Sequence, residues 1–255
     1  EADGWRHVQL VDRDGSTRRT ITCGDYDVIH MTHVDEAGEW CYFLASPENP
    51  TQCYLYRIRL DGTAAQRITP TDQSGWHSYD ISPSGSYALH TYSAFNRTPI
   101  TELINLPSHQ LVRTLVDNKA LREKVEKLKL GQTEFFRVDI GDGVELDAWC
   151  IKPTDFDATK RYPLLMHVYG EPAGTTVDDR WGGSSYLWHQ MLAQQGYVVM
   201  SFDNRGTPAP RGRDWRRVVY RQVGILAAQD QAAAVNAVLK QRTYLDPERV
   251  GVWGW

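Results

Sequence analysis

Short runs in which apolar and polar side chains alternate fill residues 1–116, and this two-residue period is that of a β-strand. One run covers 7–12, reaches a turn at Asp14-Gly15 and is followed by a second run over 17–22. The same order of run, turn and run recurs around Asp61-Gly62 and again around Pro107-Ser108. The two Asp-Gly turns lie 47 residues apart. Each pair of runs predicts an antiparallel hairpin.

A second phrase repeats in step with these hairpins. The segment 35–40 and the similar segment 82–87 each precede an apolar run, and their glycines, Gly38 and Gly85, are again 47 residues apart. Hairpins repeated at such a period are typical of β-propeller blades, each built from four antiparallel strands. We therefore expect residues 1–116 to form a partial, all-β propeller of about two and a half blades.

Residues 117–133 change from alternation to a helical period. The apolar positions fall four and three residues apart, on one helical face: Leu121, Val125 and Leu128. Asn118 is suited to cap the start of this helix, and Gly131 is suited to end it. We expect a helical connector that packs one apolar stripe, with its charged side chains in solvent.

From residue 134 onward, strand-like and helix-like segments alternate, first as a hairpin and then with long crossovers. The predicted strands are 135–140, 144–151, 162–168, 197–202 and a last strand around Val250 and Val252; the predicted helices are 185–195 and 222–241. Strands that are joined through helices pair in parallel and are covered on both faces. Residues 134–255 therefore predict an α/β domain, with the last strand buried in a parallel sheet.

Composition adds few constraints. The chain has 255 residues, 41% hydrophobic and 24% charged, with a net charge of −4, which is typical of a globular protein. This charge does not favour a nucleic acid or an anionic membrane surface as partner. The apolar runs are too short for a membrane segment, and no Cys or His spacing indicates a metal site or a cofactor.

Cys41 and Cys53 flank the predicted hairpin loop 46–50, and two interpretations stay open. They form a cross-strand disulfide, or they pack as two small reduced side chains. His30 and His33 lie three residues apart in a strand-like run, so they should point to opposite faces of a sheet.

The chain ends on Gly254-Trp255, directly after the last predicted strand. This pair matches the first half of a Gly-x-Ser-x-Gly nucleophile elbow, in which a sharp turn between strand and helix exposes the serine oxygen. The serine would be the next residue. No complete motif occurs in the chain, since 183–187 lacks the final glycine. The alternative is an ordinary strand end of an α/β protein.

Four phrases together resemble one family of serine peptidases. They are His167 to Pro172 (HVYGEP), Ser201 to Gly206 (SFDNRG), Asp246 to Arg249 (DPER) and Val252 to Trp255 (VWGW). By these phrases the chain resembles the dipeptidyl peptidase IV branch of the prolyl oligopeptidase family over its whole length. Trp255 before the expected serine favours that branch. Glu171 departs from the small residue that relatives commonly carry there.

The resemblance implies a second half of a propeller followed by the N-terminal part of an α/β-hydrolase domain. It also implies acyl transfer by a serine, with a histidine and an aspartate that follow the serine in the chain. We therefore expect a fragment, C-terminally truncated before its nucleophile and inactive alone, in which Gly254 and Trp255 are the stump of the elbow. Tyr169 is the one catalytic residue that the resemblance assigns here, as an oxyanion-hole donor.

The same resemblance implies peptide substrates with a free N-terminus and a penultimate proline or alanine, bound partly by an earlier blade, and a homodimeric parent protein. Two other hypotheses stay open. One is a non-catalytic protein that uses its propeller surface for binding. The other is a hydrolase assembled from two chains, to which this chain contributes Tyr169.

Two charged clusters favour structural roles. Asp203, Asn204 and Arg205 are interpreted as a buried ion-pair turn that fixes the loop after a strand, in preference to an acid–base cluster. The arginines of 211–221 suggest phosphate binding only superficially. In a net acidic chain we expect them to be solvated or paired with Asp214 and Asp230.

Overall fold

The computed structural model describes residues 1 and 3–254, and it divides into two compact units. The first unit is Glu1–Leu121 with two short later segments, Asp179–Trp181 and Pro210–Asp214; the second is Arg122–Asp178, Gly182–Ala209 and Trp215–Trp255.

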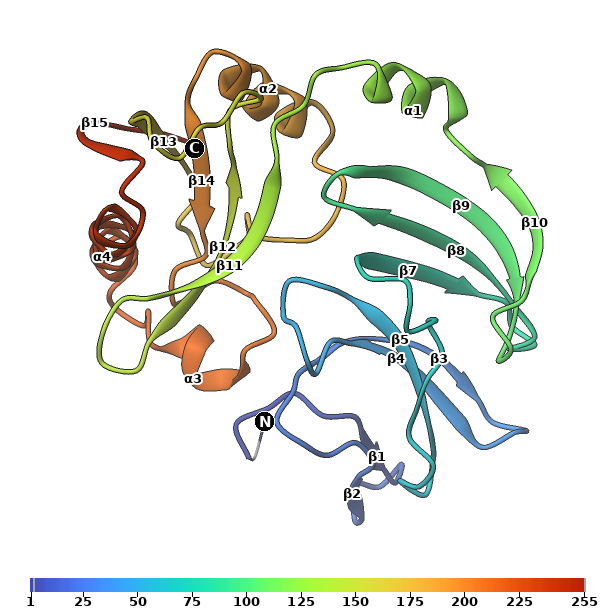
Figure 1. Ribbon diagram of the computed structural model, residues 1–255. Coiled ribbons are helices and arrows are strands. Elements are labelled where there is room, and N and C mark those ends of the chain that lie inside the picture. The colour runs from blue at the N-terminus through green and yellow to red at the C-terminus, as the bar shows by residue number, and fades with distance from the viewer. Residues whose placement is uncertain (2, 255) are drawn as a thin grey trace. The chain divides into compact units, whose positions relative to one another are not determined.

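The first unit consists of antiparallel sheets, as Figure 1 shows. A two-stranded hairpin comes first, formed by β1 (Gln9–Val11) and β2 (Arg18–Thr20). A four-stranded sheet follows, in the order β3 (Val28–Asp35), β4 (Trp40–Ala45), β5 (Tyr54–Arg59), β6 (Gln66–Arg67). The second four-stranded sheet contains β7 (Trp76–Ile81), β8 (Tyr87–Ala94), β9 (Arg97–Asn105) and β10 (Leu111–Val116). Two complete up-and-down sheets and a hairpin are the predicted blades.

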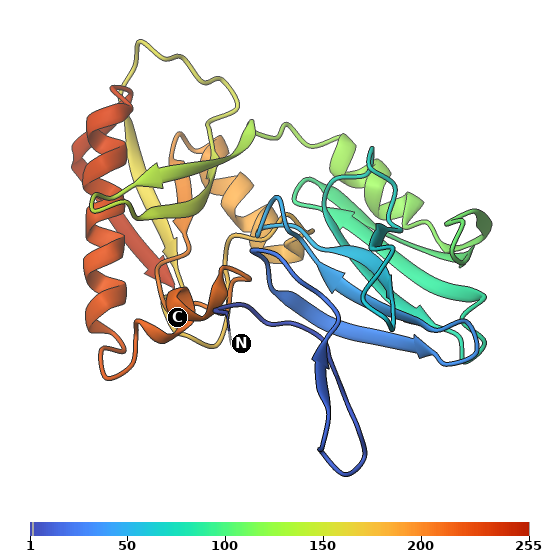
Figure 2. The ribbon, with the colours of Figure 1, turned by 90° about the horizontal axis from the view of Figure 1, so that it is seen from below.

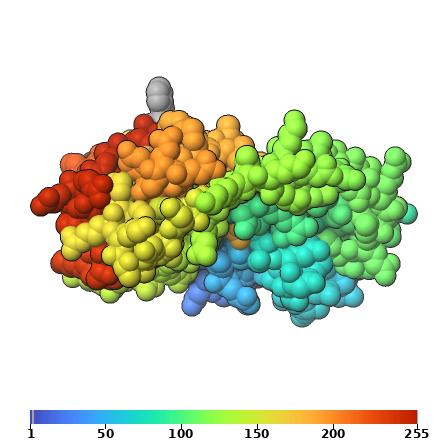
Figure 3. Space-filling model, turned by 45° about the horizontal axis from the view of Figure 1, so that its top comes forward, coloured from blue at the N-terminus to red at the C-terminus, as the bar shows by residue number. Residues whose placement is uncertain are grey.

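The two four-stranded sheets share an apolar core. Leu55 from the first sheet and Ile104 from the second belong to one buried cluster, at 0% and 1% exposure. By contrast, every residue of β10 is exposed at the surface, where the strand is green in Figure 3. Cys41 and Cys53 are both buried and are not in a disulfide. Cys41 lies opposite Ile58, so the two cysteines do not face each other across the hairpin.

The helix after β10 is shorter than the sequence predicts. Helix α1 (Lys119–Glu126) ends well before Gly131, and Val125 is its one buried residue. The predicted cap is wrong as well, because Asn118 donates a hydrogen bond to the carbonyl of Pro99. The carboxylate of Asp117 accepts the first helical N–H, that of Lys119, instead. A carboxylate is the stronger acceptor for such an N–H.

The second unit is a five-stranded sheet with helices on both faces. Its strands run in the order β11 (Thr133–Asp139), β12 (Glu145–Ile151), β14 (Val198–Phe202), β13 (Tyr162–Val168), β15 (Leu245–Gly254). β13 pairs in parallel with both β14 and β15, as predicted. The helices are α2 (Gly183–Gln194), the short α3 (Gly212–Arg217), whose residues 212–214 belong to the first unit, and α4 (Ile225–Gln241).

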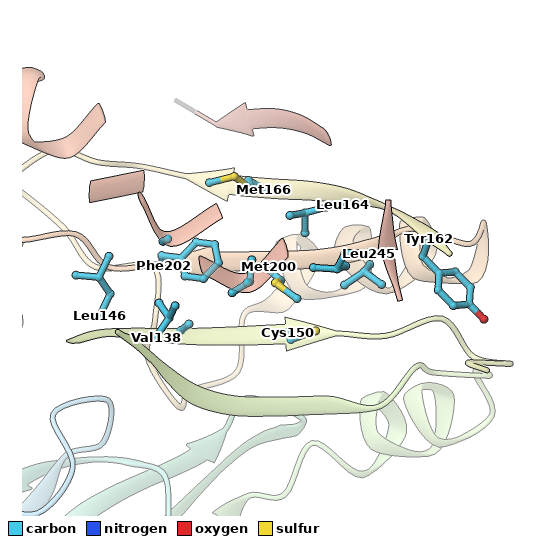
Figure 4. Packing of buried hydrophobic residues seen from close by; sticks show 13 residues of the cluster. Val138, Leu146, Cys150, Tyr162, Leu164, Met166, Met200, Phe202 and Leu245 are labelled. Atoms are coloured by element: carbon cyan, nitrogen blue, oxygen red, sulfur yellow. The ribbon is translucent and has the colours of Figure 1, made fainter. Parts of the chain in front are cut away.

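The core of this unit lies between the sheet and α4. Leu164 and Met166 of β13 pack with Ala234 and Val238 of α4 in one buried cluster, part of which Figure 4 shows. Figure 2 shows α4 alongside β15. Leu165 and His167 alternate with these two residues along β13. They point to the opposite face of the sheet, where α2 packs against β12 and β14.

The prediction that the last strand is buried is wrong. Val250 is 39% exposed and Val252 is 68% exposed, although both lie in β15 and pair with β13. Both valines line the cavity beside α4 and do not pack in the core, and among the described strands of this chain β15 pairs with β13 alone. The Asp246-Pro247-Glu248 segment interrupts the pairing, since Leu245 pairs with Tyr162 but Val250 already pairs with Leu164.

Candidate functional site at the carboxyl end of β13

Tyr169 directly follows β13 and is half-buried at the carboxyl edge of the parallel strands. Gly170, which has a positive φ of 76°, turns the chain away from the strand. The ring of Tyr169 has Gly174 behind it: a Cβ atom at position 174 would lie 3.2 Å from Tyr169 Cε1. Carboxyl edges of parallel sheets are where α/β proteins bind ligands.

Tyr169 also lines a cavity of ≈ 610 Å³ between α4 and the strands β13 and β15. The cavity wall is mainly apolar, and Glu171 and Gln231 also line it. Glu171 and Tyr169 therefore line the same cavity.

Gly254 lies at the same edge, opposite Val168 in the parallel pairing of β13 and β15. The backbones approach so closely that a Cβ atom at Gly254 would lie 1.8 Å from the carbonyl oxygen of Val168. Only glycine fits there without displacing a strand. Tyr169 therefore lies one residue beyond Val168, the β13 position that pairs with Gly254 of β15. Trp255 lies outside the described residues.

The loop that follows Tyr169 returns to the sheet at Thr176. The Asp203 carboxylate, 4% exposed, accepts hydrogen bonds from the N–H of Thr176 at 2.8 Å and from the N–H of Val177 at 3.3 Å. The Thr176 hydroxyl also contacts Asp203 at 3.1 Å. The pKa of Asp203 is raised to about 7, mainly by burial and also by the nearby Asp178, although the hydrogen-bond donors of Thr176 and Val177 oppose the shift.

The ion-pair turn predicted at 203–205 is confirmed. Arg205 donates from its guanidinium to both carboxylate oxygens of Asp230 on α4, at 2.7 and 3.0 Å, and its backbone N–H donates to the same side chain. The pair is bidentate, with Asp230 buried and the Arg205 side chain 28% exposed. The expectation that Asp230 pairs with an arginine of 211–221 is wrong, because Asp230 pairs with Arg205 instead.

The predicted basic run contains a helix that the sequence analysis missed, α3. Within the first unit, Arg213 donates to the backbone carbonyl of Glu1 at 3.0 Å, and the N–H of Gly212 donates to Asp27 at 2.8 Å. Arg213 approaches Asp214 only at 3.5 Å, with the carboxylate 96% exposed, so this predicted pair is weak. The run has a structural role at Arg213.

Two residues before Tyr169, at His167, four side chains form a row across the sheet on the face that α2 covers. Paired positions place Trp149, Ser201, His167 and Trp253 side by side on β12, β14, β13 and β15. His189 of α2, 3% exposed, covers the row, with ring centroids 4.9 Å from His167 and 5.3 Å from Trp253. Burial, together with the charge of His167, lowers the pKa of His189 to about 3. The imidazole is therefore neutral and acts as a packing ring.

The sequence analysis also missed a histidine cluster in the second blade. His77 and His90 are buried, with Nδ1 of the first 2.8 Å from Nε2 of the second. His109 contacts the Tyr79 hydroxyl at 2.9 Å. The available signal was the His-x-Tyr spacing, which occurs at 77–79 and again at 90–92 and puts both rings of each pair on one strand face.

No group of three or more His, Cys, Asp or Glu side chains that could hold a metal ion occurs within residues 1 and 3–254. No helix among these residues is both long and apolar enough to cross a membrane. What the site itself supplies is a phenol hydroxyl at the sheet edge, beside a strand end on which only glycine fits.

Comparisons with known proteins agree with this arrangement. Residues 1–99 match the family described as the dipeptidyl peptidase IV N-terminal region, and residues 184–255 match the prolyl oligopeptidase family. The crystal structure of Porphyromonas gingivalis dipeptidyl peptidase 4 superposes with a TM-score of 0.91 at 34% identity, covering 100% of this chain and 35% of that one.

Curated relatives give the same result. Dipeptidyl peptidase 4 of Trichophyton equinum is 30% identical over 259 residues, covering 100% of this chain and 33% of the relative. The Arthroderma otae dipeptidyl peptidase 4 is 29% identical over 257 residues, with the same coverage. The chain thus spans about a third of the length of these relatives. The predicted fold class, propeller blades followed by part of an α/β-hydrolase domain, is confirmed. On its fold, its site and these matches, the chain belongs to the dipeptidyl peptidase IV branch of the prolyl oligopeptidase family.

Proposed function

We propose that this chain is part of a serine-type exopeptidase that releases dipeptides from the N-terminus of peptides, with proline or alanine in the penultimate position. The observation that carries the proposal is the pairing of Val168 with Gly254, which sets Tyr169 beside the strand end where an elbow serine would follow. The matched relatives, which are named dipeptidyl peptidase 4, support the reaction class.

In this proposal the serine oxygen attacks the peptide carbonyl, and the Tyr169 hydroxyl donates a hydrogen bond to the oxygen that becomes negatively charged. The loss of one such donor costs about 3 kcal/mol of transition-state stabilisation. Gly254 lets β15 approach β13 closely enough for the serine oxygen and the Tyr169 hydroxyl to reach the same substrate carbonyl. Gly254 and Trp255 form the first half of the elbow.

The test uses the full-length protein that contains this chain and an Ala-Pro chromogenic substrate. We expect turnover that a serine-directed inhibitor abolishes, and no turnover by residues 1–255 alone, because the expected nucleophile follows Trp255. Tyr169→Phe should lower kcat about 100-fold and leave folding intact. An N-acetylated substrate is the matched control for a free N-terminus, and it should not be cleaved. Wild-type turnover in Tyr169→Phe would contradict the oxyanion role.

The homodimer that the family resemblance implies is also proposed for the full-length protein. Light scattering after size-exclusion chromatography would measure it, and a monomeric mass at micromolar concentration would contradict it.

A further inference from the structure

The carboxyl end of β14 presents two consecutive polar side chains, Asp203 and Asn204, that are buried at 4% and 1% exposure. Neither is used by the proposed reaction. Buried polar side chains are costly unless they are hydrogen-bonded, so the partners of these two show what they hold.

Each of the two side chains bonds to the loop that carries Tyr169, and they do so at opposite ends of it. Asn204 donates from Nδ2 to the carbonyl of Gly170, the residue after Tyr169, at 3.4 Å. Asp203 accepts from the N–H of Thr176 at 2.8 Å and from that of Val177 at 3.3 Å. A loop that leaves β13 is thus held at both ends by one dipeptide of the neighbouring strand.

Further contacts fix the dipeptide and the far end of the loop. Gln231 of α4 donates to Asn204 Oδ1 at 3.1 Å and to the carbonyl of Phe202 at 2.8 Å, so it orients the Asn204 amide. Trp149 donates from its indole N–H to the carbonyl of Thr176 at 2.8 Å. The Thr176 hydroxyl also meets the Ser201 hydroxyl at 2.7 Å.

Between these two attachment points, the loop folds back on the Tyr169 ring. Gly174 lies against the ring, so any shift of the loop changes the space that the ring occupies. An oxyanion donor works only when it is held close to the developing charge, and misplacement by about 1 Å can cost 100-fold in rate.

We propose that Asp203 and Asn204 are positioning residues, which hold the two ends of the Tyr169–Val177 loop and so aim the Tyr169 hydroxyl. The proposal rests on the proposed function, because it gives Tyr169 its catalytic role. Asp203 and Asn204 touch no reacting atom, and they act through Tyr169 alone.

A double-mutant cycle in the full-length protein tests this inference, with kcat and KM measured on the Ala-Pro substrate. Asn204→Ala should lower kcat about tenfold while KM stays within about twofold, because the loss is of orientation rather than of binding. In the Tyr169→Phe background the same change should have almost no effect, because the hydroxyl that it misplaces is already gone. Asp203→Asn should behave in the same way.

The matched control is Asp230→Asn. It removes the α4 carboxylate that binds Arg205, the residue after Asn204, and the hydrogen bonds of this carboxylate go to Arg205 and not to the Tyr169 loop. Its loss of kcat, whatever its size, should multiply with that of Tyr169→Phe. If Asp203→Asn fails to fold by circular dichroism, Asn204→Ala carries the test, because it removes the bond to the loop together with only the bonds to Arg205 and Gln231.

The outcomes separate the two proposals. An inactive wild type, or Tyr169→Phe at the wild-type rate, overturns the proposed function and this inference with it. An active enzyme in which the losses of Asn204→Ala and Tyr169→Phe multiply overturns only the positioning role.

Discussion

Acidification should loosen the second blade, because its buried histidines bind protons less readily in the folded state than in the unfolded state. The Nε2 of His77 faces the carbonyl of Gln73 at 3.1 Å, and a carbonyl only accepts, so this nitrogen carries the hydrogen. His77 Nδ1 must then accept from His90 Nε2. The one nitrogen of the pair left to bind a proton is His90 Nδ1, which makes no hydrogen bond and lies 3.7 Å from the Glu102 carboxylate.

The loss of stability is set by the difference between the histidine pKa values in the folded and the unfolded state. Burial lowers the pKa of His77 and of His90 from 6.5 to about 3, with neighbouring His109 also lowering both. The folded state therefore binds fewer protons than the unfolded state, and stability is lost as pH falls below 6.5. Between pH 7.5 and 5.5 each histidine that stays neutral lowers the free energy of unfolding by about 1.4 kcal/mol, and the pair lowers it by roughly 2.7 kcal/mol.

Hydrogen exchange of the β7 and β8 amides in the full-length protein, corrected for intrinsic rates, measures this free energy of opening at each pH. His90→Gln keeps a donor to His77 but cannot be protonated, so its loss between the two pH values should be smaller by about 1 kcal/mol. His30→Gln, at an exposed position, is the control and should behave like wild type. Equal losses in wild type and His90→Gln would refute the reasoning, as would a His90 titration midpoint near 6.5 by NMR.

Three further predictions concern packing. Leu164→Ala, at 1% exposure in the sheet core, should lower the free energy of unfolding by about 2–5 kcal/mol, whereas Leu10→Ala, at 43% exposure, should change it by less than about 0.5 kcal/mol; similar values in urea titrations would contradict the assigned core. Gly254→Ala should lower turnover of the full-length protein at least about tenfold, since its Cβ would meet the Val168 carbonyl; Gly251→Ala, whose Cβ meets only the flexible Leu165 side chain, should retain activity, and equal rates would count against the close approach. Gly174→Ala should press on the Tyr169 ring and lower kcat several-fold with KM unchanged, and an unaltered kcat would show that the ring has room to move.

Most of the secondary structure could be predicted from local sequence patterns. Alternation and Asp-Gly turns are properties of consecutive residues, so the hairpins of both blades and the limits of β13 could be read from the sequence. The ion-pair turn at Arg205 was predictable for the same reason, because the charges and the strand end are adjacent in the chain. Its partner was not, since Asp230 lies 25 residues further on.

Burial and site geometry depended on which segments meet in space. Val250 and Val252 have the composition of a buried strand, but they line a cavity beside α4 and remain exposed. The grip of Asp203 and Asn204 on the Tyr169 loop joins residues 27 and 34 positions apart. The sequence period depends only on residues that are close along the chain. These hydrogen bonds instead form between segments that come together in the folded sheet, so only the tertiary structure determines them.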